Sequence, residues 1–154
     1  MRETNKFELD KIKKRYSDSL SFKIQPIWDL PDPKLYSPYK NSWDSEDKLR
    51  FKLILSVSID RLFTSLDDSY LEIFKTPGLF HNRVNENKVC GILNRWEQGL
   101  PVDPPIMLWN SNSDKIMIDN GIHRLNTAIK LGALHVPIIV TTQNYLEIHS
   151  QLKE

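Results

Sequence analysis

The sequence lacks several features that mark particular classes of protein. It has one cysteine, Cys90, so no disulfide can form within the chain, and this favours a reducing compartment. No stretch reaches the roughly 18 apolar residues that a membrane-spanning helix needs. The N-terminal MRETNKFELDKIKK has no apolar core of the kind that signal peptides carry. We therefore expect a cytoplasmic chain without a membrane-spanning segment.

A large excess of charge of either sign is also absent. The 21 lysines and arginines nearly balance the 20 aspartates and glutamates, which gives a formal net charge of +1 at pH 7. Any nucleic-acid surface would therefore be a local patch rather than a property of the whole chain. The 154 residues contain no internal repeat and suffice for one domain with a real core, so we expect residues 1–154 to form a single domain.

The first 80 residues are expected to be mainly helical. Residues 3–16 have apolar positions at helical spacing. Residues 46–66 have the clearest helical pattern of the chain, because their apolar residues fall on one stripe: Phe51, Leu55, Ile59, Leu62, Phe63 and Leu66. Between them, residues 22–27 favour an extended edge segment, since a proline there cannot donate to a sheet.

Short strands alternate with helices in the C-terminal half. A helix is expected over about 85–98, then a hairpin of two apolar strands at 104–110 and 115–119, a helix over about 122–131 and a strand over 135–142. The last strand is expected to run parallel to the strand before the helix, because a right-handed crossover is the usual return. These elements predict an α+β fold, a small mixed sheet with packed helices and a helical N-terminal extension.

The polar turn DNGIHR, residues 119–124, stands between the second hairpin strand and the next helix. Backbone N–H groups and the dipole at such a helix start favour an anion, so phosphate or carboxylate is the expected ligand. Gly121 permits close approach of the backbone, Arg124 supplies a planar fork of donors, and His123 supplies a donor or an acid/base group. The alternative is a capped helix start with a surface salt bridge.

Two sequence segments, which we call the proline box and the glycine box, resemble the ParB/sulfiredoxin superfamily. The glycine box is NGIHRLNTAIKLGALHVPIIV, and the proline box is RWEQGLPVDPPIML, which has about two extra residues before its proline. The resemblance covers roughly residues 84–142. The matching positions are Glu97, Gly99, Leu100, Pro105, Ile106, Gly121, His123, Arg124, Ala128, Leu131, Gly132, Val136 and Pro137.

The resemblance implies a ParB/sulfiredoxin-like fold in which the glycine box closes around nucleotide phosphates. The implied nucleotide-binding residues are Asn120, Gly121, Ile122, His123 and Arg124. Ile122 stands where sulfiredoxin has its reactive cysteine, so sulfiredoxin activity is not expected. Asn120 replaces the usual aspartate, and Asp119 beside it can take over with a one-residue shift. The resemblance therefore implies a stand-alone ParB-like nucleotide-binding module.

The leading functional hypothesis is hydrolysis of, or phosphoryl transfer from, a nucleotide such as ATP, ADP or CTP with Mg²⁺. His123 and Glu97 are the candidate catalytic residues. Asp119, with Asp103 as a further oxygen donor, is the candidate metal ligand, acting through water. One alternative is a ParB-like nuclease or DNA-associated protein. Another is a non-catalytic module with a protein partner, in which Glu97 is only a solvated carboxylate.

Other residue types that carry chemistry have both a structural and a functional interpretation. His81 and Arg83 belong either to a polar loop or to a phosphate site. Cys90 is expected to be a buried, inert thiol. The four tryptophans are expected to be core or loop anchors, although any of them can stack on a base: Trp28, Trp43, Trp96 and Trp109.

Overall fold

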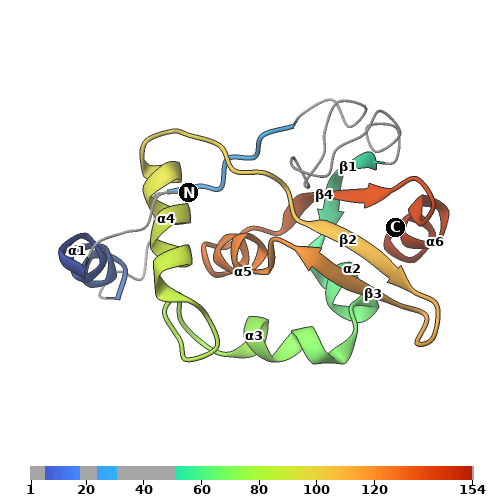
Figure 1. The fold of residues 1–154 in the computed structure, drawn as a ribbon, viewed down its shortest axis with the longest axis horizontal. Helices are drawn as coiled ribbons and strands as arrows, with labels where there is room; N and C mark the ends of the chain where they lie inside the picture. Colours follow the sequence, from blue (N-terminus) through green and yellow to red (C-terminus); the bar gives the residue numbers. More distant parts are fainter. Residues whose placement is uncertain (1–5, 18–23, 31–50, 154) are drawn as a thin grey trace.

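The computed structural model describes residues 6–17, 24–30 and 51–153 and shows an α+β fold with a mixed four-stranded sheet, as predicted (Figure 1). Within these residues, no helix is long and apolar enough to cross a membrane. The elements in chain order are α1 (Lys6–Ser17), β1 (Phe51–Ser58), α2 (Ile59–Ser65), the 3₁₀ turn η2 (Asp68–Tyr70), α3 (Leu71–Lys75), α4 (Glu86–Glu97), β2 (Ile106–Asn110), β3 (Lys115–Asn120), α5 (Ile122–Lys130), β4 (His135–Thr141) and α6 (Tyr145–Leu152).

The strand order of the sheet is β1-β4-β2-β3. β2 and β3 form the expected antiparallel hairpin, and β4 pairs antiparallel with β1 and parallel with β2. Because β2 and β3 are antiparallel, β4 runs opposite to β3, and the predicted parallel return from β3 is wrong. After α5 the chain returns to the sheet as β4, which pairs with β2 on the side of β2 that β3 does not occupy. The parallel neighbour of β4 is therefore β2 and not β3.

The sheet separates a large cluster of buried apolar side chains from a small one. Ile138 and Val140 of β4 belong to the main core, together with side chains from α2 to α6, whereas Ile139 packs with Phe51 and Ile106 in the smaller cluster. Successive side chains of a strand point to opposite faces. β4 is thus buried on both faces, which explains its nearly unbroken apolar sequence.

The helix predicted over 46–66 is wrong for most of its described length. Residues 51–58 form strand β1, and only Ile59–Ser65 are helical, as α2. The predicted helical stripe fails at Leu55, which is exposed, whereas Val57, which was not part of the stripe, is buried. Pairing with β4, with a bulge between Ile54 and Val57, supplies the backbone hydrogen bonds that select the strand.

The other helices agree with the sequence pattern. The helices predicted over 3–16, 85–98 and 122–131 correspond to α1, α4 and α5. α1 lies on the outer side of α4 (Figure 1), where Ile12 is buried beside Cys90, so the thiol is indeed buried.

The N-terminal extended segment touches the chain far from it in sequence. Trp28 forms a single parallel bridge with Val102, and its ring meets that of Trp96 edge to face at 5.6 Å between centroids. Residues 22 and 23 of the predicted edge segment, Trp43 and residues 46–50 of the predicted helix lie outside the described residues.

Candidate functional site

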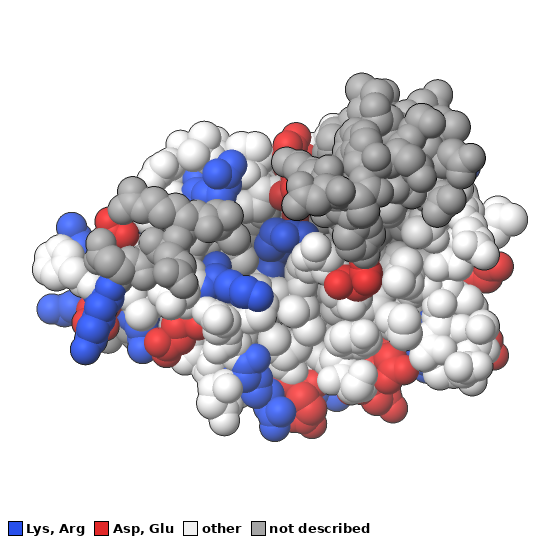
Figure 2. All heavy atoms as spheres, viewed as in Figure 1, with Lys and Arg blue, Asp and Glu red and all other residues white. Residues whose placement is uncertain are grey.

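The glycine turn lies in the wall of a cavity of about 440 Å³, which we call the turn pocket. The end of β3, the start of α5, one face of α4 and η2 form this cavity. On the face of the molecule that Figure 2 shows, Lys and Arg side chains lie over the region of α4 and α5. The lining residues are Tyr70, Lys88, Ile92, Ile118, Asp119, Asn120, Gly121, Ile122, His123 and Arg124.

The backbone at Gly121 is closely covered. Gly121 has a φ of +96°, and a Cβ there would lie 2.6 Å from Nη2 of Arg124 and 2.8 Å from Cα of Pro105. Nη2 of Arg124 also donates to the carbonyl of Pro104 at 3.5 Å. The turn therefore requires glycine both for its conformation and for space. Through these contacts the proline box meets the glycine box in space.

The start of α5 has no side-chain cap. α2 is capped by Ser58, whose hydroxyl accepts from the N–H of Arg61, and α4 by Asn85, whose side chain accepts from the N–H of Lys88. The N-cap residue of α5 is Gly121, and it has no side chain to do this. A helix start without a side-chain cap can donate its first-turn N–H groups to a ligand.

The ring of His123 is held in one tautomer. Its Nε2 accepts a hydrogen bond from the backbone N–H of Asn85 at 3.0 Å. An accepting Nε2 must be unprotonated, so the single proton of the neutral ring is on Nδ1. Burial, followed by the charges of Lys88 and His81, lowers the pKa of His123 and supports the neutral form. His123 is therefore a donor through Nδ1, and its Nε2 is occupied as long as this contact persists.

Cations outnumber carboxylates among the side chains that line the turn pocket. Lys88 and Arg124 are the cations, and Asp119 is the carboxylate. Within the described residues there is no group of three or more His, Cys, Asp or Glu side chains placed to hold a metal ion. Asp119 and Asn120 can offer oxygens to a cation only together with oxygens of a ligand. The donor set suits an anionic group directly.

The structure places Glu97, the second candidate catalytic residue, outside the turn pocket. Its carboxylate accepts from the hydroxyl of Tyr16 at 2.6 Å and from Nη2 of Arg15 at 3.1 Å, so it anchors α1 to the last turn of α4. Asp103, a further metal candidate, is exposed in the segment between α4 and β2. Neither residue lines the turn pocket.

His81 and Arg83 have structural partners in the loop before α4. Nδ1 of His81 accepts from the backbone N–H of Arg83 at 3.1 Å, and Nη2 of Arg83 lies 3.6 Å from a carboxylate oxygen of Glu72. Burial, followed by the charge of Lys130, lowers the pKa of His81. These contacts favour the polar-loop interpretation for both residues.

Sequence reasoning missed four residues of the turn pocket: Tyr70, Lys88, Ile92 and Ile118. Lys88 and Ile92 are four residues apart and therefore share one face of α4, which was a usable signal. Nothing in the sequence indicated that this face of α4 lies against the start of α5. The hydroxyl of Tyr70 donates to the carbonyl of Ile118 at 3.5 Å, which sets its ring at the end of β3. None of the described tryptophans lines the pocket.

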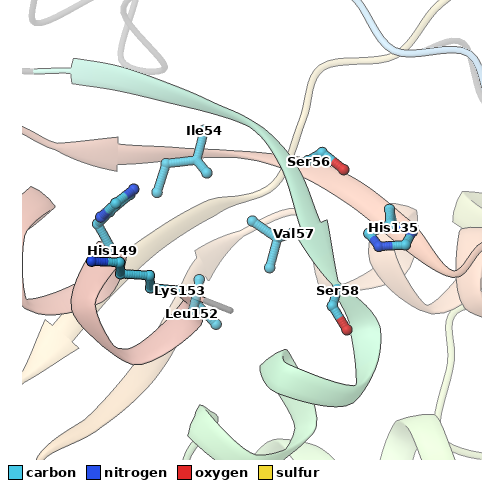
Figure 3. A pocket seen from close by; sticks show the side chains of 8 residues that line it. All are labelled: Ile54, Ser56, Val57, Ser58, His135, His149, Leu152 and Lys153. Carbon is cyan, nitrogen blue, oxygen red and sulfur yellow. The ribbon is translucent and has the colours of Figure 1, made fainter.

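A second cavity, of about 300 Å³, lies between β1, β4 and α6 (Figure 3). His135, His149 and Lys153 give it polar walls, and apolar walls come from Ile54 and Val57. The hydroxyl of Ser58, which also lines it, already caps α2. The second cavity contains neither a glycine turn nor an uncapped helix start, so the turn pocket is the better candidate site.

Comparisons with protein-family models, with curated proteins and with solved structures find no match to this chain. The resemblance to the ParB/sulfiredoxin superfamily thus rests on the two sequence boxes alone.

Proposed function

We propose that this protein binds a nucleotide, with the phosphate at the Asn120–Arg124 turn. The observation that carries the proposal is the uncapped start of α5 in the wall of a cavity, beside the guanidinium of Arg124 and the ammonium of Lys88. Backbone N–H groups, a helix dipole and two cations are the groups that bind phosphate oxygens. The volume of about 440 Å³ is in the range of cavities that hold small ligands.

The geometry supports binding more directly than phosphoryl transfer. A general base must reach the proton that it removes. Nε2 of His123 is occupied by the N–H of Asn85, and Glu97 is engaged with α1. Among the described residues Asp119 is the carboxylate that lines the pocket, and we expect hydrolysis at this site to use it. We therefore place binding first and treat hydrolysis as a second activity to be measured.

Isothermal titration of the full chain with AMP, ADP, ATP and CTP, with and without Mg²⁺, tests the proposal. We expect at least one nucleotide to bind, and Lys88→Gln and Arg124→Ala each to weaken it about tenfold, since a hydrogen bond to a charged group contributes roughly 1.5–3 kcal/mol. Arg83→Ala is the matched control, because Arg83 is exposed and lies outside the turn pocket.

Two outcomes would count against nucleotide binding. The first is that none of the four nucleotides binds while circular dichroism shows a folded chain. The second is that a DNA duplex binds at low salt with the same dependence on Lys88 and Arg124, which would favour the DNA-associated alternative. Release of inorganic phosphate from ATP, measured in parallel, reports whether Asp119 supports hydrolysis.

A further inference from the structure

The ring of His123 lies where two helix starts and the turn pocket meet. His123 belongs to the first turn of α5 and lines the pocket. Its Nε2 accepts a hydrogen bond from the backbone N–H of Asn85, the residue that caps α4. A change in this ring therefore alters both the wall of the pocket and the contact between the starts of α4 and α5.

Charged and titratable groups approach His123 from every element that borders it. Those that line the pocket beside it are Tyr70, Lys88, Asp119 and Arg124, of which the last two already interact with other groups. In the loop before α4 lies His81, and its charge and that of Lys88 oppose a proton on the ring. The charges of Glu86 and Arg83, near the start of α4, are each paired with an opposite charge. Lys88 is thus the neighbouring charge that a ligand in the pocket can offset.

The contact with Asn85 is incompatible with a protonated ring. Nε2 accepts only while it carries no proton, whereas both nitrogens of a protonated imidazole are donors. Burial, followed by the charges of Lys88 and His81, lowers the pKa of His123. Without an anion nearby, the ring is therefore neutral at pH 7 and held by Asn85.

An anion in the turn pocket changes this balance. A negative charge within about 4–6 Å of an ionisable group favours its positive form, and an anion beside Lys88 also offsets the charge that opposes protonation of His123. The protonated ring gains a second donor, because Nε2 leaves the N–H of Asn85. Coupling between two binding events is reciprocal. An anion that favours the protonated ring therefore binds more tightly when the ring is protonated.

We infer that binding of an oxyanion in the turn pocket is coupled to protonation of His123 and to release of Asn85. This inference rests on the proposed function and adds to it a regulation by pH. A phosphate group binds more tightly in mild acid than in mild base, and the bound ligand separates the start of α4 from that of α5 at this contact.

Sulfate is the first probe, because it stays doubly charged throughout mild acid and mild base. Isothermal titration of the full chain at pH 6 and pH 8, at constant ionic strength, measures its affinity. We expect binding about tenfold tighter at pH 6, since a nearby opposite charge changes a protonation equilibrium by this much or more. Equal affinities, or no binding of sulfate at either pH, overturn the inference. The nucleotide titrations described above decide the proposed function separately.

Two variants assign the pH dependence to one ring. His123→Gln does not titrate, and its affinity for sulfate should agree within about twofold at the two pH values. His81→Gln is the matched control, because His81 lies close to His123 but does not line the pocket, and it should keep the tenfold difference. A difference that persists in His123→Gln, or that disappears in His81→Gln, contradicts the role of His123. Melting curves confirm that both variants are folded.

Nuclear magnetic resonance of the unaltered chain tests both parts of the coupling without any substitution. Saturating sulfate should raise the pKa of His123. At pH 6 it should also speed hydrogen exchange of the Asn85 amide, which then loses its acceptor. A titration curve of His123 that sulfate does not move, or an Asn85 amide that exchanges equally slowly with and without sulfate, contradicts the coupling.

Discussion

Nε2 of His123 accepts a hydrogen bond from the backbone N–H of Asn85 at 3.0 Å, across 38 residues of sequence. The contact joins the first turn of α5 to the residue that caps α4. It requires a neutral imidazole, because a protonated ring has only donors. The protonation state of His123 therefore decides whether this hydrogen bond between the starts of α4 and α5 can form.

Acid is expected to destabilise the protein through His123. Its pKa is lowered in the folded state by burial and by the charges of Lys88 and His81. The unfolded chain thus binds a proton more readily, and the free energy of unfolding rises with pH. The contribution is complete above the ordinary histidine value of about 6.5 and is lost as the pH falls through it towards the lower folded value. Urea unfolding between pH 8 and pH 5 measures this.

The variant His123→Gln isolates that contribution. The side-chain carbonyl of glutamine can accept from Asn85 but does not titrate, so the decline in stability below about pH 6.5 should become shallower. His149→Gln on the exposed surface of α6 is the control for replacing a histidine elsewhere in the chain. An equally steep decline in His123→Gln would show that His123 is not the group responsible.

Gly121→Ala should destabilise the fold more than Gly132→Ala. The two glycines have nearly the same conformation, with φ of +96° and +95°. A left-handed conformation costs an alanine roughly 1–2 kcal/mol at either position. Only at position 121 would the new Cβ also overlap Pro105 and Arg124, whereas at position 132 it has nothing within 4 Å. We expect a total of about 2–5 kcal/mol for Gly121→Ala, since overpacking adds roughly 1–3 kcal/mol. Thermal unfolding of both variants gives the comparison, and equal losses would contradict the close packing of the turn.

Lys130→Met should destabilise the junction between α5 and α3. The ammonium of Lys130 donates to the carbonyls of Phe74, at 2.7 Å, and Thr76, both near the end of α3. Loss of these bonds leaves two part-buried carbonyls without their donor, and we expect a cost of about 1–2 kcal/mol. Lys75→Met is the matched control, because Lys75 is an exposed lysine on the same short helix. If both variants unfold at the same urea concentration as the parent chain, Lys130 does not anchor α3.

Cys90 should resist alkylation in the folded protein. Cys90 belongs to α4, and its side chain is fully buried where α4 packs against α1. Burial raises the pKa of the thiol to about 11. Because the thiolate is the reactive form, iodoacetamide at pH 8 should modify the native chain far more slowly than the chain in urea. Mass spectrometry follows the modification. Rapid labelling of the folded protein would mean that α1 leaves α4 readily.

The sequence predicted the parts of the fold that depend on local pattern. α4, α5 and the hairpin were recognisable, because their apolar periodicity and their turn residues agree with each other. The pattern of 51–58 indicated a helix, because Phe51 and Leu55 are four residues apart and continue the stripe of the helix that follows. Only β4, more than 75 residues further on, provides the backbone partners that make it a strand.

The candidate site divides in the same way. Residues 119–124 alone indicated a turn that exposes N–H groups, and this depends only on a glycine placed between a strand and a helix. The tertiary structure decided which side chains surround the turn: it brought Tyr70 and Lys88 to the pocket and Glu97 to α1. It also decided the tautomer of His123, because the N–H of Asn85 arrives from a distant loop. Such contacts depend on how helices pack, and helix packing is set by the whole core rather than by any one segment.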